Sequence, residues 1–160
     1  MAMPKTPALT TDCVICDNEG RVLLIRRKNE PFKGAYALPG GFVDTGETVE
    51  AACRREVLEE AGIAVGELRL VGVYSDPSRD PRGHTVSIAY MTFLPQAPSP
   101  KAGSDAEEAE WIADWRKLKL AFDHAEIIAG SVSDEEAKKI YPDGWKAPRP
   151  YIRIVPQPRS

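Results

Sequence analysis

Three glutamates, Glu56, Glu59 and Glu60, lie close together in a stretch rich in helix-forming residues. On a helix that turns by about 100° per residue, their carboxylates share an arc of roughly 100° and little more than one turn of length. Like charges at this spacing repel one another, so the face is destabilising unless something neutralises it. Carboxylate oxygens suit a hard divalent cation such as Mg²⁺ or Mn²⁺. The spacing predicts a metal-binding face, with a solvated acidic surface as the alternative.

Three features around these glutamates favour the metal site. Arg55 lies four residues before Glu59, a distance at which the two side chains can form an ion pair on a helix. Residues 38–41, Leu-Pro-Gly-Gly, supply a backbone poor in side chains whose carbonyls can approach an ion. Glu47 then places an acid at the positive end of the expected helix.

Residues 41–63 resemble a complete Nudix box. All its fixed positions are present: Gly41, Glu47, the run Arg55-Glu56-Val57, then Glu59-Glu60, Gly62 and Ile63. Fixed positions at fixed spacing make this signal far more specific than a lone glycine motif. The resemblance implies a single-domain α/β/α sandwich with a mixed sheet. It also implies hydrolysis of a nucleoside diphosphate linked to another moiety.

The same resemblance assigns roles to individual residues. It implies that Glu56, Glu59 and Glu60 bind Mg²⁺, or Mn²⁺, with the Gly40 carbonyl as a further ligand. Metal ions of this kind neutralise phosphate oxygens and lower the pKa of bound water, while a carboxylate takes the water's proton. That acceptor is left open between Glu59 and an acid of the run 105–110, in which the candidates are Asp105, Glu107 and Glu108. The alternative for this run is a solvated loop face. The catalytic candidates are Glu59, Glu56 and Glu108.

A second unusual stretch, residues 74–84, carries two arginines and two prolines. Arg79 and Arg82 can present guanidinium forks to phosphate, whereas a surface turn with an internal Arg–Asp pair is the alternative. Residues 77–84 are similar to the ADP-ribose pyrophosphatase branch of the Nudix family, which implies ADP-ribose as substrate and AMP and ribose 5-phosphate as products. Arg27 and Tyr36 are further candidates for substrate contacts.

Other members of the family suggest other functions. Residues 120–124 are also similar to Nudix-type regulators of NAD metabolism, which carry an extra winged-helix domain. Only about 20 residues follow the last expected helix, whereas a domain needs about 50, so we expect the enzyme. The alternatives are a pyrophosphohydrolase for oxidised deoxynucleoside triphosphates and a non-catalytic module that senses ADP-ribose. A third enzyme reaction, removal of pyrophosphate from RNA 5′ ends, is disfavoured because the basic excess is missing.

Composition limits the class of protein. The 160 residues carry 24 acids and 21 bases, for a net charge of −3 and a pI near 5.5. This balance argues against a nucleic-acid or membrane-surface binder. No apolar run approaches the roughly 18 residues of a membrane span, and residues 1–10 lack the apolar core of a secretory signal, so we expect a cytoplasmic protein. The three cysteines are expected to be buried thiols.

The elements that must position these residues form one domain, residues 1–160. The pattern predicts strands at 11–17, 21–27, 37–43, 68–74 and 85–94, and helices at 48–61, 120–131 and 134–141. Residues 18–20 predict a hairpin turn, because glycine stands at its sharp position. Residues 1–10 are expected to be a flexible N-terminus and residues 142–160 a proline-rich tail. Analogy with the family implies a homodimer.

Overall fold

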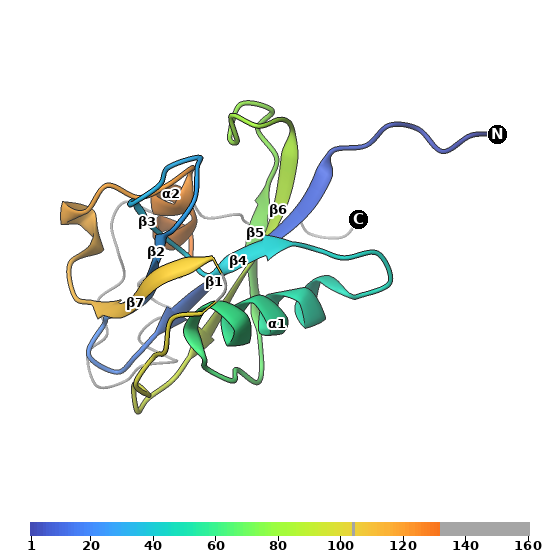
Figure 1. Cartoon of the computed structure of the whole chain (residues 1–160). Coiled ribbons are helices and arrows are strands. Elements are labelled where there is room, and N and C mark those ends of the chain that lie inside the picture. Colours follow the sequence, from blue (N-terminus) through green and yellow to red (C-terminus); the bar gives the residue numbers. More distant parts are fainter. Residues whose placement is uncertain (104, 132–160) are drawn as a thin grey trace, which may run out of the picture.

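A mixed seven-stranded β-sheet forms the centre of the protein (Figure 1). A computed structural model of the chain describes residues 1–103 and 105–131. The strands are β1 (Ala8–Cys16), β2 (Val22–Arg27), β3 (Tyr36–Ala37), β4 (Gly40–Phe42), β5 (Arg69–Tyr74), β6 (Thr85–Phe93) and β7 (Ala106–Ile112). The helices are α1 (Val49–Ala61) and α2 (His124–Ala129), with a short 3₁₀ turn at Trp115–Lys117.

The sheet is organised around β1. Its order is β3-β2-β1-β6-β5, with β4 added to β1 and β7 added to β2. The long β1–β6 pair is parallel. The β1–β2, β1–β4, β2–β3, β2–β7 and β5–β6 pairs are antiparallel. Strands buried on both faces are typically continuous apolar runs, and residues 13–16 of β1 are fully buried.

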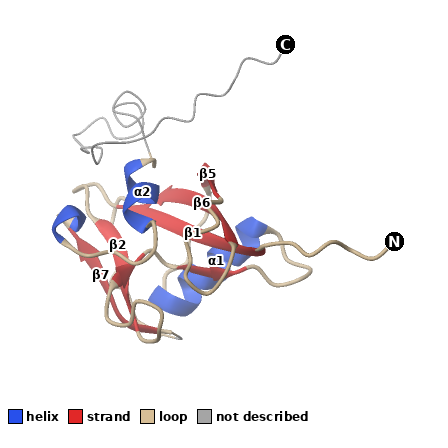
Figure 2. Cartoon of the chain, turned by 90° about the horizontal axis from the view of Figure 1, so that it is seen from above, coloured by secondary structure: helices blue, strands red, loops and turns tan. Residues whose placement is uncertain are grey.

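The two helices cover opposite faces of the sheet (Figure 2). Alternate residues of β1 face opposite ways, so Cys13 and Ile15 pack with Cys53 and Val57 of α1. On the other face, residues 14 and 16 of β1 join a cluster that includes Ile127 and Ile128 of α2. This arrangement is the predicted α/β/α sandwich. The three cysteines are free and buried, as predicted.

Helix α1 begins and ends as the sequence predicts. The Thr48 side chain accepts a hydrogen bond from the Ala51 N–H at 3.1 Å, which caps the first turn. Gly62 stops the helix with a left-handed φ of 67°, and its N–H donates to the Leu58 carbonyl. Both ends are therefore fixed locally, which sets the rotation of the glutamates about the helix axis.

Several predicted elements differ in the structure. Residues 106–110 of the acidic run are part of β7 and not a loop, because they pair with β2. The helix expected at 120–131 is shorter, since residues 120–123 form the bridge and turn that precede α2. The hairpin at 18–20 is confirmed by the pairing of Cys16 with Val22. Strand β1 begins at Ala8, within the expected flexible N-terminus. The helix expected at 134–141 and the tail at 142–160 lie outside the described residues.

Neither helix in the described part of the chain is long and apolar enough to span a membrane.

The cap at Gly62 yields a prediction on stability. Gly62→Ala is expected to lower the free energy of unfolding by about 1–2 kcal/mol, because an L-residue at this positive φ is strained. An added Cβ would also lie 3.1 Å from the Lys101 carbonyl oxygen. Gly66→Ala is the matched control, since nothing lies within 4 Å of its added Cβ. Urea denaturation measures both variants, and equal stability of Gly62→Ala and the wild type would refute the strained cap.

Candidate active site

Of the three glutamates of α1 predicted to bind a metal, Glu56 and Glu60 face β4, whereas Glu59 is more exposed. Glu60 is only 6% exposed, and its Oε2 accepts the Gly40 N–H at 3.2 Å. The Glu56 carboxyl lies against Gly41 so closely that a Cβ at Gly41 would sit 2.6 Å from it. The Glu59 side chain is 45% exposed. Gly41 is therefore required for the close approach of β4 to α1.

Arg55 connects the acids around this face. Its Nη2 lies 2.6 Å from Glu47 Oε1, and its Nη1 lies 2.8 Å from Glu56 Oε1 and 3.3 Å from Glu59 Oε2. Nη2 also donates to the Phe42 carbonyl at 3.0 Å. The predicted Arg55–Glu59 ion pair is confirmed. Hydrogen bonding to Glu47 is the main cause that raises the pKa of Arg55.

Burial perturbs the two inward carboxyls. The pKa of Glu60 is raised to about 8, first by burial and then by the charge of Glu56. The pKa of Glu56 is also raised, again chiefly by burial. Asp105 adds repulsion to both groups. Both carboxyls therefore ionise less readily than an exposed glutamate.

The chemistry of this donor set fits a hard divalent cation. Buried carboxylates that repel one another are stabilised by a bound cation, and carboxylate and carbonyl oxygens are the ligands that Mg²⁺ and Mn²⁺ prefer. Within residues 1–103 and 105–131, no three His, Cys, Asp or Glu side chains are already gathered as a metal cluster. Arg55 holds oxygens of Glu56 and Glu59. A cation must compete with this guanidinium for the same atoms.

A pocket opens beside Glu60. It is lined by groups from β1, β2, β4, α1, the β5–β6 loop and the start of α2: Thr10, Asp12, Ile25, Arg27, Leu38, Gly40, Gly41, Phe42, Glu60, Arg79, Asp80, Arg82, Phe122 and His124. Acidic groups and guanidinium groups thus meet in one cavity, which suits a ligand that carries phosphates and binds with a metal.

Two arginines form the positive side of this pocket. Arg82 holds Asp80 with both ends of its guanidinium, at 3.1 and 2.8 Å, and its Cζ lies 5.2 Å from the Phe42 ring centre. Arg27 lies over Phe122 at 5.1 Å, and its Nε donates to the Pro31 carbonyl. Among the described residues Arg27 has no carboxylate within ion-pair distance. Burial, followed by the charge of Arg82, lowers the pKa of Arg27.

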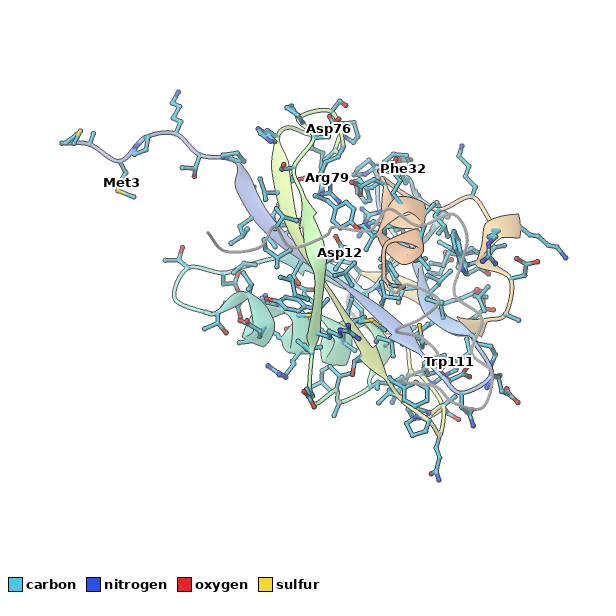
Figure 3. All side chains as sticks on the ribbon, turned by 180° about the vertical axis from the view of Figure 1, so that it is seen from behind. Met3, Asp12, Phe32, Asp76, Arg79 and Trp111 are labelled. Carbon is cyan, nitrogen blue, oxygen red and sulfur yellow. The ribbon has the colours of Figure 1, made fainter. Side chains whose placement is uncertain are left out.

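Arg79 reaches the same pocket in a different way. Its side chain is 4% exposed and points from the β5–β6 loop back towards Asp12 (Figure 3). It donates to the Asp123 carboxylate at 2.8 and 2.5 Å and to Thr85 Oγ1 at 2.9 Å. These partners engage most of its donors, so it ties the loop to the start of α2.

Tyr36 and Glu108 lie in another cluster. The Tyr36 hydroxyl donates to Glu110 at 3.0 Å, and its ring lies beneath Arg26. Glu108 is 3.7 Å from the same arginine and is half exposed. Neither residue lines the pocket. The structure therefore brings Gly40, Glu60, Arg27 and Arg82 together but leaves these two apart.

Asp12 and Phe122 line the pocket but are not among the residues predicted from the sequence. Asp12 is a lone acid in an apolar strand and is 6% exposed, which could have indicated a buried polar network. Phe122 has a left-handed φ of 51° and meets Phe32, whose φ is 60°, at a ring distance of 4.8 Å. Such strained backbone often occurs at functional sites, but no residue pattern signals it.

Comparisons with known proteins agree with the geometry. The NUDIX domain profile matches residues 6–131. The chain belongs to the NUDIX family. It is 51% identical over 122 residues to an ADP-ribose pyrophosphatase of Methanocaldococcus jannaschii, covering 76% of this chain and 71% of that protein.

Two further similar proteins are connected with ADP-ribose by name, and one of them is a regulator. An ADP-ribose-responsive transcriptional repressor of Acinetobacter baylyi is 35% identical over 130 residues, which cover 77% of this chain but only 52% of the repressor. The NUDIX domain of Shewanella oneidensis NrtR, solved with ADP-ribose, matches with a TM-score of 0.74 and 29% identity. That match covers 79% of this chain and 86% of that one. The fold and the family are therefore shared by enzymes and regulators.

The raised pKa of Glu60 predicts a pH-dependent stability. Between the ordinary value near 4.5 and about 8, the folded state binds more protons than the unfolded state, so metal-free stability falls as pH rises through this window. Glu60→Gln is expected to raise the free energy of unfolding by about 1–3 kcal/mol at pH 8 and far less at pH 4. Urea denaturation in chelator measures the difference.

Glu59→Gln is the matched control, because Glu59 lies on the same helix and is 45% exposed. It is expected to change stability by less than about 0.5 kcal/mol. A gain for Glu60→Gln that is the same at pH 4 and pH 8 would contradict the burial of an ionisable Glu60.

Proposed function

We propose that the protein hydrolyses ADP-ribose to AMP and ribose 5-phosphate with a divalent cation. The observation that carries this proposal is the pocket in which the Glu60 carboxyl and the Arg27 and Arg82 guanidiniums line one cavity. A diphosphate needs both kinds of group, since carboxylates recruit the cation and guanidiniums bind phosphate oxygens directly. The 51% identity to an ADP-ribose pyrophosphatase supports this substrate.

We assign the cation to Gly40, Glu56, Glu59 and Glu60, with Mg²⁺ as cofactor and Mn²⁺ as a substitute. When bound, it neutralises phosphate oxygens and lowers the pKa of bound water. Glu60 and Gly40 are held by their mutual hydrogen bond, and Glu56 is held by its contact with Gly41. Gly40, Glu56 and Glu60 are therefore held close together, and the cation would displace Arg55 from the Glu56 carboxylate.

The chemical step needs a proton acceptor. Water adds to one phosphorus, the P–O–P bond breaks, and the water's proton leaves to a carboxylate. Glu59 is the preferred acceptor, because its half-exposed side chain shares Arg55 with Glu56, next to the proposed cation ligands. Glu108, held by Arg26 outside the pocket, is the weaker candidate.

We assign Arg27 and Arg82 to the diphosphate. Arg27 has no described carboxylate partner, so a phosphate would supply the missing negative charge. Arg79 and Tyr36 remain predicted substrate residues. The bonds of Arg79 to Asp123 favour a role in orienting the loop, and Tyr36 lies with Glu110.

A homodimer is inferred from family analogy, and sedimentation velocity tests it. The acidic pI argues against nucleic acid as a partner and is compatible with a cytoplasmic location. A module that only senses ADP-ribose is the second candidate, because one similar protein is an ADP-ribose-responsive repressor and another NUDIX domain was solved with ADP-ribose. The full set of acids argues against it, since a sensor need not keep mutually repelling glutamates.

Product analysis tests the proposed reaction. With Mg²⁺, ADP-ribose is expected to give AMP and ribose 5-phosphate, and Glu59→Gln and Glu60→Gln are each expected to reduce kcat at least about 100-fold. Glu50→Gln on the same helix is the control and should retain activity. Pyrophosphate released from an oxidised deoxynucleoside triphosphate would instead support nucleotide sanitising. Tight binding of ADP-ribose without turnover would support the sensor.

The arginine assignment has its own test. Arg27→Gln and Arg82→Gln are each expected to raise KM for ADP-ribose by at least about 10-fold, because each removes a charge-assisted phosphate contact. Steady-state kinetics measure the change. Arg54→Gln is the control, since Arg54 donates to the Gly66 carbonyl on another side of α1. An unchanged KM in both pocket variants would refute the assignment.

A further inference from the structure

His124 at the start of α2 uses both ring nitrogens inside the protein. Its Nδ1 accepts the Leu38 N–H at 3.0 Å, from a residue 86 positions earlier in the chain. Its Nε2 lies 3.2 Å from Asp12 Oδ1, and the residue is 4% exposed. A backbone amide can only donate, so Nδ1 carries no proton and the ring is the neutral Nε2–H tautomer. His124 therefore donates to Asp12 and accepts from Leu38.

Asp12 fixes the orientation of this ring. Ser87 Oγ donates to Asp12 Oδ2 at 2.5 Å, and Arg79 Nη2 lies 3.8 Å from the same oxygen. Asp12 and Ser87 stand on the paired central strands β1 and β6, and both are buried. Asp12 and Ser87 thus hold the ring from the central strands, so that Nδ1 of His124 faces the Leu38 N–H.

The segment that His124 holds leads directly into the proposed cation site. The Pro39 carbonyl accepts the Cys13 N–H at 2.9 Å, and Gly40 pairs with Asp12. Gly40 then donates to Glu60. An added Cβ at Gly40 would lie 2.1 Å from the Thr11 carbonyl oxygen, so the packing against β1 is close. At Leu38 this segment is held by His124, which lies outside the sequence signature at residues 41–63.

We propose that His124 is a positioning residue for the cation site. It holds the Leu38 amide through Nδ1 and so keeps Gly40 against Glu60. The contact between Nε2 and Asp12 keeps Nδ1 directed at Leu38. His124 acts through the backbone and does not itself hold the cation. This inference rests on the cation site of the proposed function and adds a residue that lies far from the signature in the chain.

Three substitutions separate the two ends of the ring. In His124→Asn the amide oxygen replaces Nδ1 as acceptor for Leu38, whereas His124→Gln places its amide near Asp12 and leaves Leu38 without a partner. His124→Phe removes both contacts. The probe is Mn²⁺ alone, titrated into the full chain and followed by electron paramagnetic resonance. Hydrogen exchange of the Leu38 amide in chelator and the thermal midpoint are measured on the same samples.

The positioning role predicts a specific order. His124→Asn should bind Mn²⁺ within about threefold of the wild type, whereas His124→Gln and His124→Phe should bind about 10-fold or more weakly, as expected for lost outer-shell support. Exchange at Leu38 should stay slow in His124→Asn and become fast in the other two. With ADP-ribose, kcat should fall in His124→Gln while KM changes little.

Other outcomes overturn the proposal. If His124 only fills space, Asn should be the worst replacement because it is the smallest, and Mn²⁺ affinity should follow the thermal midpoint. If His124 contacts substrate, KM should rise with Mn²⁺ affinity unchanged. Should His124→Phe not fold, His124→Gln and the exchange measurement decide the question. A wild type that binds Mn²⁺ but does not hydrolyse ADP-ribose would refute the proposed reaction and leave this inference standing.

Discussion

Repulsion among carboxylates on one side of α1 is the constraint on which the site depends. Glu56 and Glu60 are turned towards β4, where burial raises the pKa of both. In the described structure Arg55 offsets part of this cost by holding Glu47, Glu56 and Glu59. The helix cannot rotate to expose the acids, because Val57 and Cys53 on its other side are packed against β1. The buried acids therefore lower the free energy of unfolding, and a bound cation can restore it.

The rest of the pocket comes from segments that are distant in the chain. Strand β1 contributes Asp12, and the parallel partner β6 contributes Ser87 beside it. Arg79 ties the β5–β6 loop to Asp123, and the next residue, His124, ties α2 to Leu38. Buried, fully partnered polar groups of this kind favour one arrangement over its alternatives. The same network thus fixes the loop that carries Arg82 relative to the start of β4 at Gly40.

The parts of the fold that could be predicted are those that depend on residues close together in the chain. Thr48 and Gly62 give the ends of α1, and the alternation of β1 gives its two buried faces. The acidic run was misassigned because its residues look solvated, whereas pairing of β7 with β2 is a long-range effect that composition does not encode. The glutamate face and the Arg55–Glu59 pair follow from helix spacing. The separation of Tyr36 and Glu108 from the pocket, and the contacts of Asp12 and His124, depend on tertiary packing.

A crystal of the protein soaked with Mn²⁺ and ADP-ribose, with data collected at the manganese absorption edge, tests the central claim most directly. We expect an anomalous peak bounded by carboxylate oxygens of Glu56, Glu59 and Glu60 and by the Gly40 carbonyl, with the diphosphate between it and Arg82. An ion bound elsewhere, with Arg55 still holding Glu56 and Glu59 and both carboxylates unliganded, would contradict it.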